Sequence, residues 1–138
     1  MVLTRSAAAV ARHAEADIAR HGLTPGEFGV LEALYHKGPM LLGEVQRKVL
    51  VSSGGVTYLV DRLEAQGLVE RRACPGDRRA RYAALTKVGE ARIASVFPEH
   101  AKAIEHAVSG LTAAERRTAT RLLRKLGLRA AESLAALP

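Results

Sequence analysis

The chain has 138 residues, of which 48% are hydrophobic and 25% are charged, a balance typical of one compact globular domain and not of a disordered chain. The formal net charge of +7 favours an anionic partner: nucleic acid, a membrane surface or an acidic protein. Cys74 is the only cysteine, which excludes an intrachain disulfide, and no apolar run reaches the ~20 residues of a membrane span. We therefore expect a soluble, cytoplasmic protein that does not associate with membranes.

The first two helices are marked by hydrophobic spacing and by their ends. Apolar residues recur at steps of three or four over residues 3–21, which predicts a helix that Gly22 ends. Thr24, with Glu27 three positions later, has the arrangement of a helix capping box. We predict a second helix from this point to about Tyr35.

The next two helices are shorter and are followed by a change of period. Apolar spacing predicts helices over residues 42–49 and 53–66. Residues 68–72 and 81–85 have the pattern of two short strands, and turn formers and charges fill the segment between them. We predict a β-hairpin with a long basic loop over residues 73–80.

Two longer helices complete the chain. Thr86 is the predicted N-cap of a fifth helix that runs to about residue 109, and Thr112 with Glu115 forms a second capping box before a sixth helix. The element order is therefore four helices, a hairpin and two helices. This order predicts a mainly α fold with a small β-hairpin.

A pair of short helices followed by a basic hairpin is the pattern of a winged helix-turn-helix, in which the hairpin is the wing. The helix over 42–49 would cross the DNA backbone, and the helix over 53–66 would enter the major groove. Its outward face supplies the residues that we expect to contact DNA: Ser53, Gly54, Gly55, Thr57, Tyr58 and Arg62. The alternatives are a frayed helix start for the two glycines and packing against the wing for Tyr58. Phosphate would repel Asp61, so we expect it to orient Arg62 or an arginine of the wing.

The hairpin is strongly basic. From Arg71 to Arg81 it has five arginines and one acidic residue, Asp77. Arginine fits a narrow, electronegative minor groove, and a hairpin tip has the reach to enter one. We therefore expect Arg78 and Arg79 to contact DNA, and the alternative is an ordinary solvated turn.

Several motifs stand in register along the chain. The segments 77–79 (Asp-Arg-Arg) and 85–89 (Leu-Thr-Lys-Val-Gly) resemble the D-x-R wing and the L-T-x-x-G strand-to-helix junction of the MarR (multiple antibiotic resistance regulator) family. The segments 23–31 and 53–69 are similar to the second helix and to the recognition helix of that family. The resemblance spans nearly the whole chain, and motifs in register are far more specific than any one of them alone.

The resemblance implies a transcriptional repressor that is an obligate homodimer. Its two recognition helices would occupy successive major grooves of a pseudo-palindromic operator on double-stranded DNA, and a small-molecule or redox signal would release it by altering the spacing of the two lobes. The resemblance also makes Arg79 the minor-groove residue. Asp77 would hold the wing by pairing with a neighbouring arginine such as Arg81.

The same resemblance divides a single domain, residues 1–138, into a winged helix-turn-helix lobe at 23–88 and a helical dimerisation region at 1–21 and 89–138. Aromatic residues make up only 4% of the chain, so a second subunit would also help to supply buried area. An effector pocket between the two regions would be lined by His13, Tyr35 and His36. For each of these three, a partly buried helix residue with a backbone partner is the alternative.

Other chemistry is disfavoured. Cys74 beside arginines is a candidate oxidant sensor, but an inert surface thiol is the favoured interpretation, because no resolving cysteine accompanies it. The histidines lack the i, i+4 pair of a helical zinc site, so we expect no metal and no cofactor. No triad context or phosphate-binding glycine loop is present, so we expect no enzyme and no catalytic residue. The main alternative function is a winged-helix protein–protein interaction module that does not bind DNA.

Overall fold

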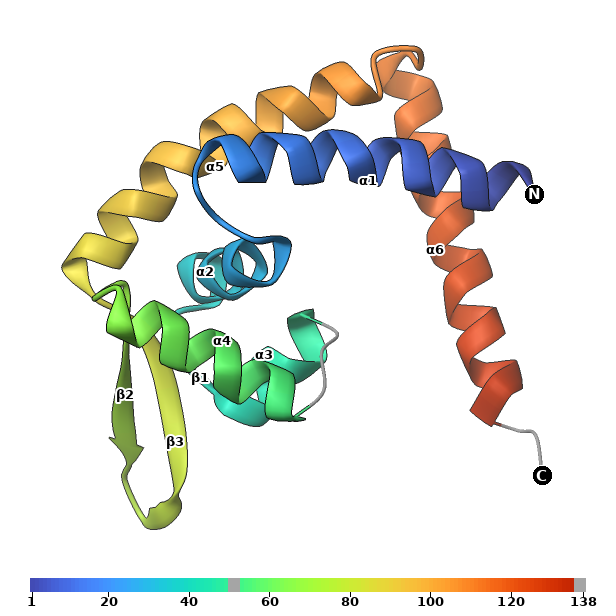
Figure 1. Cartoon of the computed structure of the whole chain (residues 1–138). Helices are drawn as coiled ribbons and strands as arrows, with labels where there is room; N and C mark the ends of the chain where they lie inside the picture. The colour runs from blue at the N-terminus through green and yellow to red at the C-terminus, as the bar shows by residue number, and fades with distance from the viewer. Residues whose placement is uncertain (50–52, 136–138) are drawn as a thin grey trace. The chain divides into compact units, whose positions relative to one another are not determined.

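A computed structural model of the chain describes residues 1–49 and 53–135 (Figure 1). Within these ranges the chain forms six helices and a small antiparallel sheet of three strands, which confirms the predicted fold class. The bounds are α1 Val2–Arg20, α2 Pro25–Lys37, β1 Met40–Leu41, α3 Leu42–Val49, α4 Ser53–Ala65, β2 Val69–Cys74, β3 Asp77–Leu85, α5 Lys87–Ala107 and α6 Ala113–Ala135. The side chains of Ser53 and Arg78 lie outside the described part.

The start of α2 is set by the residues that the sequence indicates. The Thr24 hydroxyl accepts a hydrogen bond from the Glu27 N–H at 3.2 Å, and the Glu27 carboxylate accepts one from the Thr24 N–H at 2.9 Å. This reciprocal pair is the predicted capping box. Gly22 and Gly38 flank α2 with φ angles of 70° and 75°, a left-handed conformation that glycine adopts without a steric penalty.

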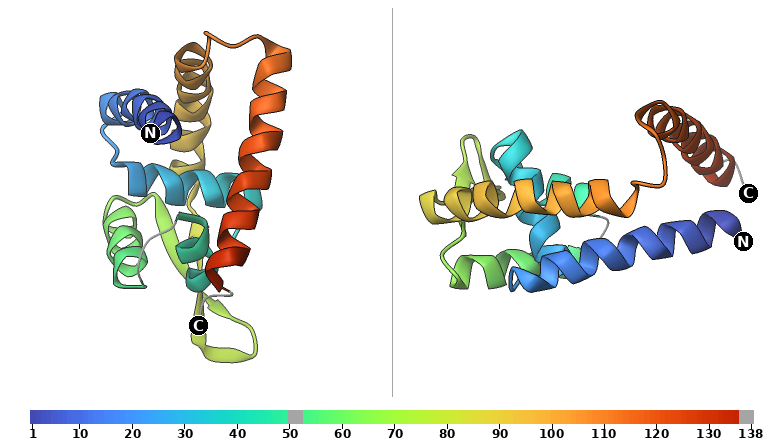
Figure 2. Two further views of the ribbon diagram at one scale, coloured as in Figure 1. Left: turned by 90° about the vertical axis from the view of Figure 1, so that its right-hand side faces the viewer. Right: turned by 90° about the horizontal axis from the view of Figure 1, so that it is seen from above.

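The predicted long loop of the hairpin is wrong. β2 and β3 continue to Cys74 and Asp77, and only Pro75 and Gly76 lie between the strands. Gly76 has a φ angle of 87°, which lets the chain reverse within two residues. The basic residues that suggested a loop lie on a ladder open to solvent, where charge does not oppose strand pairing. The hairpin therefore projects beyond the helices of its own unit (Figure 2).

β3 is the central strand of the sheet, between β2 and the two-residue strand β1, which no sequence pattern predicted. The register of the hairpin changes near its tip. One step along β2, from Ala73 to Cys74, corresponds to four steps along β3, from Arg81 to Asp77. Three residues, 78–80, are therefore extra on β3 and form a bulge, a device that re-aims side chains.

The core lies where α2, α4 and the start of α5 meet the base of the sheet. Leu31, Leu63 and Ile93 are among its largest fully buried side chains. The apolar cluster consists of Ile18, Leu23, Phe28, Val30, Leu31, Leu34, Met40, Val45, Val56, Leu59, Val60, Leu63, Leu68, Val69, Ala83, Ile93 and Val96. Because these residues cover the inward stripes of α2 and α4, the opposite stripe of α4 faces solvent.

Thr86 and Gly89 fix the passage from the hairpin into α5. The Thr86 hydroxyl donates to the carbonyl oxygen of Gly67 at 2.6 Å and accepts from the Gly89 N–H at 3.0 Å, which makes Thr86 the predicted cap. A Cβ at Gly89 would lie 1.9 Å from the carbonyl oxygen of Leu68, so only glycine allows this approach. The L-T-x-x-G motif is thus a packing contact between α5 and the chain before β2.

The chain divides into two compact units, residues 1–104 and 105–138. In the second unit, α6 begins with its predicted capping box: the Glu115 carboxylate accepts from the Thr112 N–H at 2.7 Å, and the Thr112 hydroxyl accepts from the Glu115 N–H at 3.3 Å. None of the side chains of α6 is buried.

Candidate nucleic-acid interface

The outward face of α4 presents the predicted contact residues. Those that are exposed are Gly54, Thr57, Tyr58 and Arg62, whereas Gly55 is half-buried. Ser53 begins the helix, but its side chain lies outside the described part. A Cβ at Gly54 would have no neighbour within 4 Å, so no packing contact within the described fold requires a glycine there. A bare backbone in the first turn of a helix allows the close approach of an external phosphate.

Arg62 is tied to a buried carboxylate of α2. Its Nε donates to Glu27 Oε1 at 2.9 Å, and its Nη1 donates to the Tyr58 hydroxyl at 3.3 Å. The Glu27 residue is only 1% exposed, whereas the Arg62 side chain is 48% exposed. Burial alone would raise the pKa of Glu27, but hydrogen bonds from Thr24 and Arg62 outweigh it and hold that pKa below its ordinary value. The sequence indicated Glu27 only as a helix cap, and its contact with α4 was missed.

A second group of ion pairs joins α4 to the hairpin. Arg71 of β2 donates through Nη2 to Asp61 at 2.5 Å and through Nη1 to Glu64. Asp61 was expected to orient Arg62 or an arginine of the wing, and its partner is Arg71 of the wing. Because Arg71 is neutralised by two carboxylates, the positive charge that is available to an outside partner lies nearer the tip of the hairpin.

The tip of the hairpin is organised by Asp77. Its carboxylate accepts from the Arg79 N–H at 2.8 Å, which fixes the backbone of the bulge. Arg81 Nη1 donates to the Ala80 carbonyl at 3.3 Å, and the expected ion pair between Asp77 and Arg81 stays a prediction. Arg79 is exposed, and the side chain of Arg78 lies outside the described part.

A hollow of about 310 Å³ lies between α3 and the hairpin. Its lining includes Arg47 of α3, Arg79 and Arg81 of β3, and one acid, Glu44, whose carboxylate accepts from the Leu41 N–H at 3.0 Å. Three arginines around one hollow favour an anionic group such as phosphate. Arg47 was not singled out from the sequence, although it lies in the last turn of α3, the helix that was expected to cross the DNA backbone.

Two of the three predicted effector residues lie together. The ring centres of Tyr35 and His36 are 5.3 Å apart, and Phe97 of α5 lies 6.2 Å from the first ring and 4.7 Å from the second. Tyr35 also lines a cavity of about 220 Å³ with polar residues of β2 and α5. His13 is exposed on α1, and no ring contact described for the chain joins it to this aromatic cluster.

A buried polar cluster between α1 and α5 was not predicted. Asp17 is 4% exposed, and its carboxylate contacts Arg20 at 2.5 Å and His100 Nδ1 at 3.0 Å. His21 Nε2 lies 3.9 Å from Asp17 and 3.5 Å from Glu99. Burial would raise the pKa of Asp17, but hydrogen bonds from Arg20 and His100 bring it below its ordinary value. Asp17 and His100 are 83 positions apart, so local spacing contains no signal of the pair.

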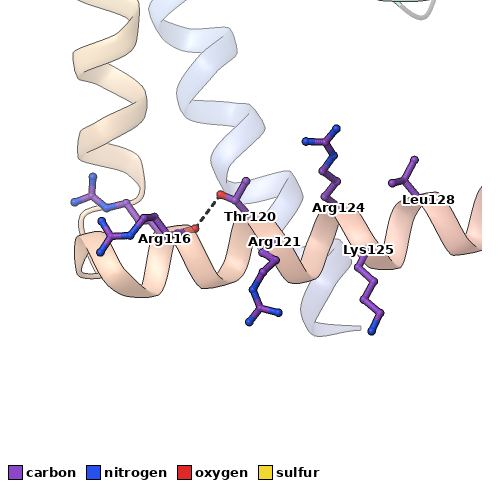
Figure 3. Close-up of a pocket in the computed structure, with 7 residues that line it drawn as sticks. Arg116, Thr120, Arg121, Arg124, Lys125 and Leu128 are labelled. Carbon is purple, nitrogen blue, oxygen red and sulfur yellow. Dashed lines mark hydrogen bonds between the residues drawn. The ribbon is translucent and has the colours of Figure 1, made fainter.

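The helix α6 has a basic side and an apolar side. The basic side borders a hollow of about 680 Å³, which is lined by Arg116, Arg117, Thr120, Arg121, Arg124, Lys125 and Leu128 (Figure 3). Leu122 and Leu126 lie one turn apart on the other side of the helix, and they are 51% and 54% exposed. A solvated helix gains nothing from such a leucine stripe, which stays exposed in the single chain.

Over residues 1–49 and 53–135, no group of three or more His, Cys, Asp or Glu side chains could hold a metal ion. None of the helices that the structure describes is long and apolar enough to cross a membrane. Cys74 is half-buried, and its hydrogen bond with Tyr82 is the main cause that raises the pKa of the Tyr82 phenol.

This arrangement has counterparts among known proteins. A model of the MarR family matches residues 21–80. The HTH-type transcriptional regulator MhqR of Bacillus subtilis is 41% identical over 130 residues, which cover 94% of this chain and 90% of that protein. A structure of BpsR of Bordetella bronchiseptica, described for the regulation of its DNA binding by 6-hydroxynicotinic acid, superimposes with a TM-score of 0.82 and 28% identity, covering 91% of this chain and 90% of that one. A MarR variant from E. coli complexed with operator DNA superimposes with a TM-score of 0.81 and 25% identity over the same shares of the two chains.

These relatives are regulators and not enzymes. The helical fold with its hairpin, the exposed face of α4 and the similarities to these proteins point to the same family as the sequence motifs do. The chain belongs to the MarR family of HTH-type transcriptional regulators.

Proposed function

We propose that the chain is a sequence-specific repressor that binds a pseudo-palindromic operator on double-stranded DNA as a homodimer and is released by a small-molecule or redox signal. The observation that carries this proposal is the combination, in one unit, of an exposed α4 face and a projecting basic hairpin. The helix enters a major groove, and the hairpin tip reaches the neighbouring minor groove.

The distribution of charge supports a division of labour. Arg47, Arg79 and Arg81 border one hollow beside the hairpin and contact phosphates or the minor groove, which supplies most of the affinity. The outward residues of 53–62 supply the choice of sequence. The MarR variant from E. coli was solved with operator DNA, and its likeness to this chain favours the same mode of binding here.

The exposed leucines of α6 support the homodimer. Leu122, Leu126 and Leu134 are 51%, 54% and 70% exposed in the single chain. Burying this side against a second copy would gain roughly 25 cal/mol for each Å² of apolar surface removed from water. The dimer then presents two α4 helices at the spacing of successive major grooves, roughly 34–36 Å.

The effector part of the proposal rests on the aromatic cluster. BpsR is described as regulated in its DNA binding by 6-hydroxynicotinic acid, a small aromatic acid. In this chain Tyr35 and His36 stand beside Phe97, and we assign them, with His13, to an effector site. A ligand that binds one spacing of the two lobes more tightly would shift the dimer away from the DNA-bound state. A redox signal would act through Cys74, the only cysteine of the sequence.

The deciding experiment is a binding titration of the purified chain with a duplex from its own promoter, followed by fluorescence anisotropy in a salt series. We expect the logarithm of the binding constant to fall linearly with the logarithm of salt concentration. The promoter duplex should also bind at least roughly a thousandfold more tightly than a scrambled duplex at physiological salt. Failure to bind the promoter at any salt concentration would favour the protein-interaction module instead.

A further inference from the structure

Three hydrogen-bond donors converge on the buried carboxylate of Glu27. The Thr24 N–H donates to Oε2 at 2.9 Å, and both Arg62 Nε, at 2.9 Å, and Gln66 Nε2, at 3.1 Å, donate to Oε1. Only an ionised carboxylate offers acceptors on both sides. A glutamine at this position would turn its own NH₂ group toward at least one of the donors. Glu27 is therefore required as an anion, although a helix cap alone tolerates Glu and Gln equally.

The guanidinium of Arg62 is held on two sides and open on the third. Its Nε–H is taken by Glu27, and one Nη1–H is directed to the Tyr58 hydroxyl at 3.3 Å. The Arg62 Cζ also lies 5.8 Å from the Tyr58 ring centre. A guanidinium has five N–H donors in one plane, so its outer edge, formed by Nη1 and Nη2, keeps donors for an acceptor pair outside the chain.

The charge of this site favours a base over a phosphate. Glu27 and Arg62 form an ion pair with no net charge, so the pair gains little Coulomb attraction to a phosphate. Its remaining N–H groups still have the spacing that matches two adjacent acceptors. In the major groove, O6 and N7 of guanine are such a pair.

We propose that Glu27 is a positioning residue that aims the outer edge of Arg62 at O6 and N7 of one guanine in each half of the operator. Glu27 thus determines sequence preference although it lies under α4 and does not touch DNA. This inference rests on the proposed function, because it assumes that α4 lies in a major groove.

The test compares the full-length chain with Glu27→Gln on a promoter duplex in which each guanine of one half-site is replaced in turn by 7-deazaguanine, which lacks N7. For the wild type we expect one replacement to weaken binding about tenfold. In Glu27→Gln that loss should shrink to less than about twofold. Affinity for a scrambled duplex should stay equal or rise, since the variant removes a negative charge near DNA.

Two matched variants separate positioning from folding. Thr24→Ala removes the hydroxyl of the capping box but keeps the backbone N–H and the Arg62 contact, so it should lower stability and leave guanine discrimination intact. Arg62→Lys keeps the charge without the planar fork, so it should lose discrimination as Glu27→Gln does, and the double variant should lose no more. This second variant also provides the test if Glu27→Gln does not fold.

The outcomes are distinct. Undiminished discrimination in a folded Glu27→Gln, or in Arg62→Lys, would overturn the inference. An equal loss on operator and scrambled duplexes, with a shallower salt dependence, would also overturn it by making Arg62 a phosphate contact. If the wild type binds no duplex, the proposed function fails before Glu27 is tested.

Discussion

Replacing Gly89 with alanine should destabilise the chain through one backbone contact. The added Cβ would lie 1.9 Å from the Leu68 carbonyl oxygen, and real Cβ atoms keep at least 3.0 Å from such atoms, so α5 and this carbonyl must separate by roughly 1 Å. No rotamer can relieve the clash, because both groups belong to the backbone. The movement also stretches the two hydrogen bonds of Thr86. Overpacking costs ~1–3 kcal/mol, and each weakened hydrogen bond costs up to ~1 kcal/mol. Together these costs exceed the ~1 kcal/mol that alanine gains over glycine in a helix.

We therefore expect Gly89→Ala to lower the free energy of unfolding by about 3 kcal/mol. The measurement is urea unfolding followed by circular dichroism, with all variants at one protein concentration, because a dimer unfolds in a concentration-dependent way. Gly43→Ala is the matched control: its Cβ would lie 3.9 Å from Arg47 Nη1, an ordinary contact, so stability should stay equal or rise by up to ~1 kcal/mol. Equal stability of Gly89→Ala and wild type would refute the close approach of α5 to Leu68.

Three further predictions concern the tip, the dimer and acid stability. Arg79→Ala should weaken operator binding more than about tenfold without unfolding the chain, whereas Arg121→Ala, the same charge change on α6, should leave operator binding unchanged. Equal affinities of Arg79→Ala and the wild type in anisotropy titrations would remove the wing from the mechanism. Leu126→Glu should convert the proposed dimer to a monomer, as measured by light scattering, whereas Leu128→Glu on the basic side of α6 should leave the dimer intact. A dimeric Leu126→Glu would contradict the assignment of the leucine side of α6 to the dimer interface. The pKa of Asp17 is lowered in the folded chain, so the stability that its carboxylate contributes is present above the ordinary pKa of 3.8 and is lost as pH falls through the folded pKa. In urea titrations at decreasing pH, Asp17→Asn should therefore lose less of its free energy of unfolding than the wild type does. An unchanged dependence of that free energy on pH would argue against the buried contacts.

Local signals predicted the elements well. The capping boxes at Thr24 and Thr112, the helix end at Gly22 and the cap at Thr86 each act through neighbours within three or four positions, and the structure contains each of these contacts. The loop of the hairpin was predicted wrongly because charge and turn formers were interpreted together, although only Pro75 and Gly76 make the turn. A two-residue strand such as β1 has no period to detect.

The interactions that organise the candidate site were less accessible. Glu27 and Arg62 are 35 positions apart, and each residue has an adequate local explanation, one as a cap and the other as a solvent-facing cation. Asp17 and His100 meet only because α1 and α5 cross. Such pairs depend on tertiary packing. The spacing of hydrophobic residues predicts which side of a helix is buried, but it does not predict which residue of another element will contact it.

The double contact of Arg71 with Asp61 and Glu64 has a consequence for how this protein can respond to a signal. It joins α4 to the wing through two carboxylates, so these two elements should move together and keep a constant separation. In the proposed dimer, a response to a ligand would then change the angle between the two copies. Distance measurements between spin labels on the two copies of the wing would therefore record the response, whereas labels on α4 and the wing of one copy would stay at a constant separation.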